Sequence, residues 1–150
     1  QEELGLRGVQ ALSRHARPDV AIVLEGTPAD DTPGFIPDEA QGLMGEGVQI
    51  RMHDPSAIMN PRLTDLTIET AEKEKIPHQL AVRRGGGTDA GRIHLSGEGV
   101  PCVVLGVPSR YIHSHNSIID IADYRAMVDL SVALIRRLTT EQVSGLTEFL

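Results

Sequence analysis

The sequence of 150 residues contains no tryptophan, few other aromatic side chains and a single cysteine. With aromatic residues at 3%, Val, Ile, Leu and Ala must fill the core, as in sheets that helices cover on both faces. The lone thiol, Cys102 in the apolar run PCVVLGV, cannot form an intrachain disulfide and is expected to be buried. Composition therefore favours an α/β protein in the reducing cytoplasm.

The chain also has few positively charged residues and no long apolar run. The chain has 14 Lys and Arg against 21 Asp and Glu, a net charge of -7, and its arginines are scattered rather than clustered. Binding to a phosphate backbone usually needs a basic face, so nucleic acid is not an expected partner. No apolar stretch approaches the ~18 to 20 residues of a membrane span, so a membrane is not expected either. A chain of this length can hold a core without disulfides.

Apolar runs and helical patterns alternate along the chain. Strands are expected over 19–26, 47–54, 78–84 and 101–108, and helices over 6–17, 60–76, 92–99 and 120–138, with a last amphipathic segment over 140–150. Asn60 and Asp120 are suited to cap the helices that follow them. In the helix after Asp120, one stripe holds Ile121, Tyr124, Val128, Ile135 and Leu138.

The spacing of these elements predicts a three-layer α/β/α sandwich. The unbroken apolar run before Glu25 is typical of a central parallel strand. Several connections are too short for crossovers, so the sheet should be mixed, though mostly parallel. The irregular segment 27–47, with its prolines and glycines, is expected to be a surface or functional loop.

Polar residues that local structure does not explain follow the ends of apolar segments. Glu2 and Glu3 are adjacent, and at a strand end their side chains would point in different directions, so each could take a different role. Glu25 ends an apolar strand, where an unpaired carboxylate is costly. His113 and His115 follow another strand, and imidazole is a common metal ligand. A solvated acidic turn, a carboxylate emerging into solvent and ordinary surface histidines remain the alternatives.

The glycine-rich stretch GGGTDAG, residues 85–91, is not a standard phosphate-binding motif. It lacks the Lys-Ser/Thr end of a P-loop and the spacing of a dinucleotide fold. Three glycines indicate close approach of the backbone to a ligand or another strand, with Thr88 or Asp89 capping a helix. The chain also has no GxSxG, HExxH or paired CxxC motif, which argues against serine hydrolases, helix-borne zincins and zinc ribbons.

Four stretches in this order, QEELGLRG, PDVAIVLEGTPADDTPG, GGGTDAGRIHL and PSRYIHSH, resemble the tetrahedral, self-compartmentalising aminopeptidases. These are two-metal exopeptidases, including glutamyl and leucyl aminopeptidases, and they are often labelled as endoglucanases. The resemblance runs from Gln1 to about Leu138. It implies a zinc-exopeptidase type of α/β fold and release of N-terminal residues from peptides.

The resemblance also implies roles for single residues. Glu2 matches the general base, Glu3 a ligand of one metal and His113 a further ligand of that metal. Glu25 matches a ligand of the other metal, although many members have aspartate there, which leaves the metal preference open. The residues implied to contact substrate are Gly86, Gly87, Thr88, Asp89 and Arg110.

Two divalent ions, Zn, Co or Mn, are the implied cofactors, because carboxylate and imidazole ligands accept all three. Such ions lower the pKa of a bound water, and a glutamate that is not itself a ligand accepts its proton. Peptides are the implied substrates. In the full-length family, dimers assemble into a dodecamer, so a homo-oligomer is expected.

Parts of the family pattern have no counterpart in this chain. A histidine in an H-x-D motif, an aspartate that bridges both ions and an inserted β-rich domain are all missing. Residues 1–150 are therefore expected to be the C-terminal part of a catalytic domain, which alone would bind metal weakly and show little activity. A non-catalytic assembly or regulatory module of the same fold is the alternative. Glycoside hydrolysis by Glu2 and Glu25 is a third reading, which leaves His113 and Glu3 without a role.

Overall fold

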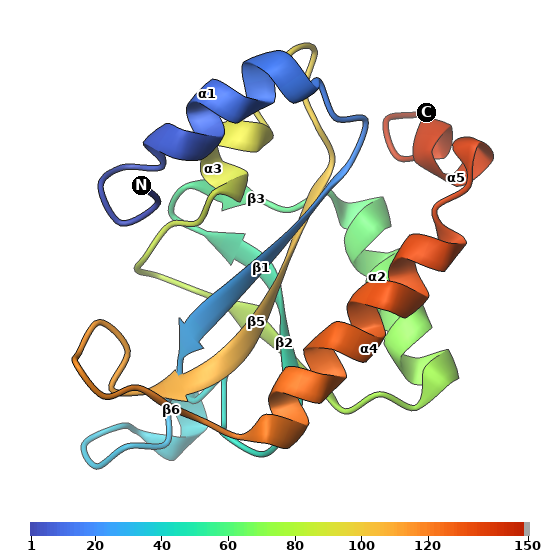
Figure 1. Cartoon of the computed structure of the whole chain (residues 1–150). Helices are drawn as coiled ribbons and strands as arrows, with labels where there is room; N and C mark the ends of the chain where they lie inside the picture. The colour runs from blue at the N-terminus through green and yellow to red at the C-terminus, as the bar shows by residue number, and fades with distance from the viewer. Residues whose placement is uncertain (149–150) are drawn as a thin grey trace.

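The computed structural model describes residues 1–148, which form one six-stranded sheet with helices on both faces (Figure 1). The helices are α1 (Arg7–Ala16), α2 (Pro61–Glu74), α3 (Ala90–Ile93), α4 (Ile121–Arg137) and α5 (Thr140–Gly145), with a 3-10 helix, η1 (Pro37–Glu39). The strands are β1 (Ala21–Pro28), β2 (Val48–Asp54), β3 (Ala57–Ile58), β4 (His78–Val82), β5 (Cys102–Arg110) and β6 (Ile118–Ile119). Of the segment predicted over 140–150, the last two residues lie outside the described part. No helix in residues 1–148 is long and apolar enough to cross a membrane.

The sheet is mixed, and its longest ladders are parallel, as predicted. Strand β5 lies between β1, which is parallel to it, and β2, which is antiparallel to it. Strand β4 is parallel to β2 on the other side. The parallel ladders β1/β5 and β2/β4 join eight and five residue pairs, against three pairs for β2/β5. The two-residue strands β3 and β6 were not predicted, because two residues are too short to show a periodicity.

Strand β1 differs from its prediction as a central strand. Among the described residues it pairs only with β5, so its other edge carries no partner strand. Ile22 packs against the core below α4, but Leu24 on the same face is 52% exposed. The apolar run predicted burial on both faces, whereas within residues 1–148 the helices cover only part of β1.

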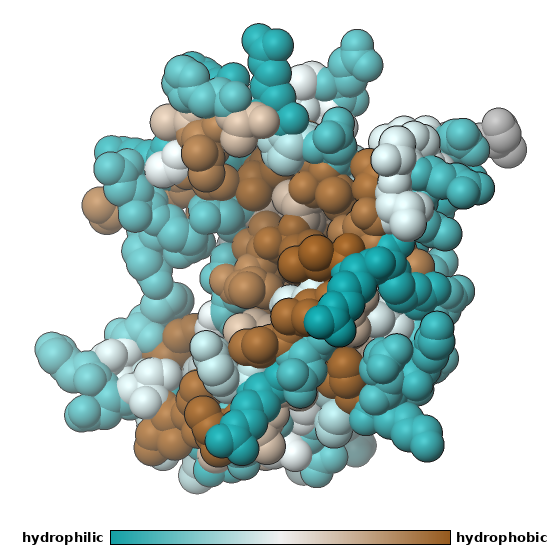
Figure 2. Space-filling model, turned by 45° about the vertical axis from the view of Figure 1, so that its right-hand side comes forward, coloured by the Kyte–Doolittle hydropathy of each residue, from teal (hydrophilic) through white to brown (hydrophobic). Residues whose placement is uncertain are grey.

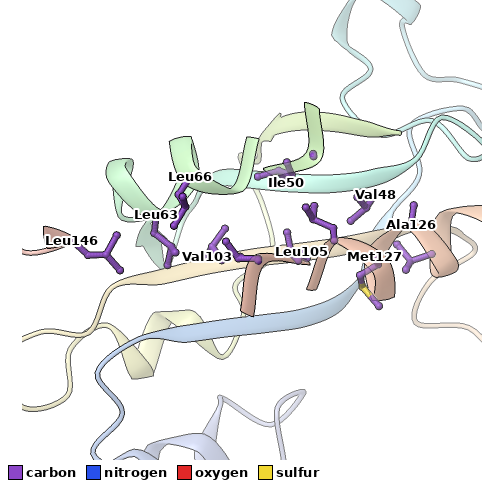
Figure 3. Close-up of a cluster of buried hydrophobic side chains, with 13 residues drawn as sticks. Val48, Ile50, Leu63, Leu66, Val103, Leu105, Ala126, Met127 and Leu146 are labelled. Carbon is purple, nitrogen blue, oxygen red and sulfur yellow. The ribbon is translucent and has the colours of Figure 1, made fainter. Parts of the chain in front are cut away.

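The main core lies between the sheet and the pair α2 and α4 (Figure 3). Leu63 of α2, Leu105 of β5 and Leu130 of α4 have no exposed surface. Burying a leucine side chain contributes roughly 1.5–3 kcal/mol, so this layer supplies much of the stability of the fold. As predicted, Asn60 caps α2, since its side chain accepts a hydrogen bond from the N–H of Leu63 at 2.9 Å.

Helix α4 begins where it was predicted, but it faces the core with a different side. The Asp120 side chain caps it by accepting a hydrogen bond from the N–H of Ala122 at 2.7 Å. Four residues of the predicted stripe, Ile121, Tyr124, Val128 and Ile135, are exposed. The buried positions are instead Asp123, Ala126, Met127, Leu130, Ser131 and Leu134. Apolar surface gathers on the face of the molecule that bears α4 (Figure 2).

The opposite face of the sheet has a smaller core, beneath α3 and α1 (Figure 1). Its buried residues are Val23, Ala57, Met59, Ala90, Val100, Cys102 and Val104. Cys102 is buried as predicted, and burial raises the pKa of its thiol to about 12. Helix α3 has four residues and starts two residues before its predicted range. Because side chains alternate along a strand, Glu25 and Thr27 share this face with Val23. These two residues lie beyond the cluster beneath α3.

Candidate active site

An open cleft of about 860 Å³ lies on this second face. Its walls come from the N-terminal turn, β1, β2, the glycine-rich segment and the turn after β5. The glycine-rich segment, the turn after β5 and the N-terminus extend toward the same side of the molecule (Figure 1). The lining residues are Glu2, Glu3, Gly5, Leu6, Glu25, Gly26, Pro28, Arg51, Gly85, Gly86, Gly87, Thr88, Ile112 and His113. The cleft thus brings together the predicted base, the three predicted metal ligands and three of the predicted substrate-contacting residues.

The strand β1 places Glu25 in this cleft, opposite a glycine of β5. Glu25 pairs in register with Gly106. A Cβ at Gly106 would lie 2.7 Å from Cγ2 of Thr27, so only glycine fits there without a shift of β1. Burial, and then the negative charge of Glu2, raise the pKa of Glu25 to about 7, while the positive charge of Arg51 opposes this rise. A bound cation would favour the ionised carboxylate at this half-buried position.

Glu2 and Glu3 lie in a turn that leads into α1, rather than at the end of a regular element. The carbonyl of Glu2 accepts hydrogen bonds from the N–H groups of Gly5 and Leu6 at 3.0 and 2.9 Å. Gly5 has a φ of 99°, which a residue with a side chain rarely adopts. Burial, followed by the charges of Glu3 and Asp89, raises the pKa of Glu2.

The side chain of Glu3 meets His113, the first histidine after β5. Its Oε1 lies 3.1 Å from Nε2 of His113, and the two side chains are 70% and 66% exposed. Tyr111 and His113 both have φ near 60°, so this turn holds two residues in the left-handed region. Two ligands that the resemblance assigned to one metal are therefore in contact. His115 is exposed and does not line the cleft.

The glycine-rich segment forms a further part of the cleft wall. The backbone amide of Asp89 lies close enough to the Glu25 carboxylate to lower the pKa of that group. The Oδ1 atom of Asp89 is buried and has no hydrogen-bond partner within residues 1–148, and burial raises its pKa. Of the two predicted caps, Thr88 and Asp89, it is Asp89 that occupies the N-cap position of α3, although its side chain makes no capping hydrogen bond.

Arg110 does not line the cleft. Its Nε and one terminal nitrogen donate hydrogen bonds to the two oxygens of Asp31, both at 2.8 Å. The Arg110 guanidinium lowers the pKa of Asp31 by this hydrogen bonding. The pair ties the segment 27–47 to the end of β5, and the structure does not bring Arg110 together with the other predicted substrate-contacting residues.

Arg51 lines the cleft and was not predicted as a site residue. It is 4% exposed, and it donates hydrogen bonds to Asp54 Oδ2 at 3.2 Å and to Thr27 Oγ1 at 3.0 Å. Its Nε has no hydrogen-bond partner in the described part of the chain. An arginine inside the strand pattern GVQIRMHD, three residues before an aspartate, was the available signal, because a buried cation needs a paired anion.

The cleft residues fit part of a metal site. In residues 1–148, no three His, Cys, Asp or Glu side chains are grouped closely enough to hold a metal ion. The contacting pair Glu3 and His113 nevertheless offers one oxygen and one nitrogen donor, and Glu25 offers a half-buried carboxylate. This donor chemistry suits Zn, Co or Mn, and each ion would need further ligands.

Comparison with known proteins extends this picture. The glutamyl aminopeptidase of Lactococcus lactis is 38% identical over 149 residues, which are 99% of this chain and 41% of that protein. The crystal structure of a TET aminopeptidase from a marine sediment thaumarchaeon has a TM-score of 0.94 and 45% identity, covering 98% of this chain and 41% of that one. The TET1 peptidase of Pyrococcus horikoshii, which can assemble into a tetrahedron or a large octahedral shell, has a TM-score of 0.66 and 29% identity, over 88% and 37% of the two chains.

The chain thus spans about two fifths of the length of the curated relatives it matches. These structures confirm the predicted α/β fold, with a mixed sheet and helices, as that of the TET aminopeptidases. The profile of the M42 glutamyl aminopeptidases matches residues 1–130, which is most of the chain. The chain belongs to the M42 glutamyl aminopeptidase family.

Proposed function

We propose that the protein is a metal-dependent aminopeptidase that removes N-terminal residues from peptides, and that this chain contributes one side of its active site. The observation that carries the proposal is the meeting of Glu2, Glu3, Glu25 and His113 in one cleft from three separate segments of the chain. Membership of the M42 family and the names of the relatives support it.

In this proposal each acidic residue has its own task. Glu3 and His113 hold one divalent ion, and Glu25 holds a second. Such a metal pair supplies an activated water and polarises the scissile carbonyl. Glu2 accepts the proton of the attacking water and passes it to the leaving amine, so that hydrolysis consumes one water. Glu2 suits this task because it lines the cleft beside Glu3 and is not itself a proposed ligand.

The substrate side of the cleft is assigned to the glycine-rich segment. Gly86, Gly87 and Thr88 line the cleft together with Glu2, and the backbone amide of Asp89 lies close enough to Glu25 to lower the pKa of its carboxyl group. We further propose a homo-oligomer built from dimers into a dodecamer, which the assembling Pyrococcus horikoshii relative supports. Light scattering on the purified protein tests this, and a monomer in solution would contradict it. The cytoplasmic location stays a prediction.

The decisive experiment substitutes Glu2→Gln in the protein produced from its complete gene. Gln cannot accept the proton, so kcat on glutamyl, leucyl and lysyl anilides should fall roughly 10²–10⁴-fold. Metal content, measured by inductively coupled plasma mass spectrometry, should stay at the wild-type level, because Glu2 is not a proposed ligand. Glu39→Gln, an exposed carboxylate on η1, is the matched control and should retain activity.

Other outcomes of this experiment separate the alternatives. A Glu2→Gln variant that retains activity would remove Glu2 as the base. A wild-type protein that binds no metal and cleaves no anilide would favour a non-catalytic assembly module. Release of sugar from a β-glucan, lost in both Glu2→Gln and Glu25→Gln, would favour glycoside hydrolysis.

A further inference from the structure

The glycine-rich segment is attached to the protein at its two ends but not in its middle. Within residues 1–148, the backbone N–H and C=O groups of Gly85, Gly86 and Gly87 make no hydrogen bond. A Cβ added at Gly85 or Gly86 would meet no atom within 4 Å, so neighbouring atoms do not constrain these two residues. Three consecutive glycines also have the greatest backbone freedom. The cleft therefore presents a row of polar backbone groups that only attachments on either side can hold in place.

The first attachment is Arg83. One terminal nitrogen of Arg83 donates hydrogen bonds to both oxygens of Asp30 at 2.8 Å. Its backbone N–H also donates to the carbonyl of His53 at 2.9 Å. Asp30 is 5% exposed, so this end of the segment is fixed by a buried ion pair.

The second attachment is Thr88, which contacts two residues of the turn after β2. Thr88 Oγ1 donates to Asp54 Oδ2, and the Thr88 N–H donates to Ser56 Oγ, both at 3.4 Å. Ser56 Oγ in turn donates to Asp54 Oδ1 at 2.5 Å, so one carboxylate fixes both contacts. A Cβ at Gly87 or Gly91 would lie 3.1 or 2.6 Å from the Ser56 side chain, so the segment packs closely on Ser56.

Asp54 is itself held firmly. It has no exposed surface, and its Oδ1 also accepts hydrogen bonds from the N–H groups of Ser56 and Ala57 at 2.8 and 3.2 Å. Its other oxygen accepts from Arg51. Burial alone would raise the pKa of Asp54, but the hydrogen bonds from Ser56 and Arg51 outweigh it and the pKa is lowered. Asp54 can therefore stay charged beneath the cleft.

We propose that Asp54 and Ser56 are positioning residues which, through Thr88, hold Gly85, Gly86 and Gly87 ready to bind the main chain of a peptide substrate. The inference rests on the proposed aminopeptidase function and adds a mode of substrate binding. Unpaired backbone N–H and C=O groups can exchange hydrogen bonds with the main chain of a peptide. Holding that row in advance reduces the entropy lost on binding, so the loss of the attachment should weaken binding rather than chemistry.

The test is Ser56→Ala in the protein produced from its complete gene, assayed with a tripeptide. Loss of the two hydrogen bonds of Ser56 Oγ, to Asp54 and from the Thr88 N–H, should raise KM about 5–10-fold and leave kcat within about twofold, the pattern of weakened ground-state binding. Hydrogen exchange should become faster in residues 84–91. Thr88→Val removes the hydroxyl that contacts Asp54 and should behave in the same way.

Ser131→Ala is the matched control. Ser131 is a buried serine on α4 that donates to the carbonyl of Met127 at 2.7 Å, and its loss should change neither KM nor exchange in residues 84–91. An unchanged KM in both Ser56→Ala and Thr88→Val would overturn the binding role. Unchanged hydrogen exchange of residues 84–91 in these variants would overturn the positioning role. If the wild-type protein cleaves no peptide, the proposed function fails, and exchange alone then decides whether Ser56 positions the segment.

Discussion

The two walls of the cleft are built in different ways. On the sheet wall, Arg51 and Asp54 are at most 4% exposed and are joined by hydrogen bonds to β1 and to the glycine-rich segment. On the loop wall, Glu3 and His113 contact each other but are at least 66% exposed. A substitution on the sheet wall should therefore affect the stability of the fold, whereas one on the loop wall should affect function and leave stability nearly unchanged.

The largest effect is expected from Asp54→Ala on the sheet wall. Removing Asp54 leaves the Arg51 charge buried without a partner, which typically costs about 3–5 kcal/mol of unfolding free energy. Glu69→Ala is the matched control, because Glu69 pairs with Arg137 at a similar distance, 3.3 Å, but is 65% exposed. Its loss should cost no more than about 1 kcal/mol. Urea unfolding of the protein from its complete gene measures the unfolding free energy of both variants. Equal losses in Asp54→Ala and Glu69→Ala would contradict the distinction between the buried and the exposed ion pair.

A smaller effect is expected from Gly106→Ala beneath Glu25. The new Cβ would lie 2.7 Å from Thr27 Cγ2 and 3.0 Å from Thr27 Cβ, so β1 or β5 must shift, at a cost of about 1–3 kcal/mol. At Gly26, the neighbour of Glu25, a Cβ would make ordinary contacts at 3.6 and 3.7 Å. Gly26→Ala should therefore be neutral or slightly stabilising. Thermal unfolding distinguishes the two variants, and an unchanged midpoint for Gly106→Ala would show that the strands adjust freely.

The same contrast between walls explains how much the sequence could predict. Glu25 and His113 were identified because each follows an apolar run in the sequence, and such runs can be read from local pattern. The run placed the strand end wrongly at Glu25, because β1 continues beyond it to Pro28. The caps Asn60 and Asp120 were identified for a similar reason, since a cap acts within its own helix. Local pattern is thus enough for features that lie within one element.

Features that depend on contacts between elements were missed or placed wrongly. The partners of Arg51 come from β1 and β2, and the contact of Ser56 with Thr88 joins residues 32 positions apart. Helix α4 has apolar residues on two sides, so its pattern could not show which side faces the sheet. Arg110 lies within the RYIHS motif, yet its partner is Asp31, 79 residues earlier. Pairing across such distances is decided by the sheet register, which a single sequence does not display.

The smallest effect on stability, and the sharpest test of the comparison, is expected from Glu3→Gln on the loop wall. The exposed contact with His113 contributes little, so the unfolding free energy measured without metal should change by less than about 0.5 kcal/mol. Gln keeps the size of Glu3 but removes the charge that the proposed ion needs, so zinc bound per chain, measured by equilibrium dialysis, should fall. Asp54→Ala should show the opposite pattern where the variant still folds. Its unfolding free energy should fall strongly, while its zinc binding should fall only in proportion to the unfolded fraction. If Glu3→Gln retained full zinc binding, Glu3 would be only a surface partner of His113, and the loop wall would lose its proposed role in holding metal.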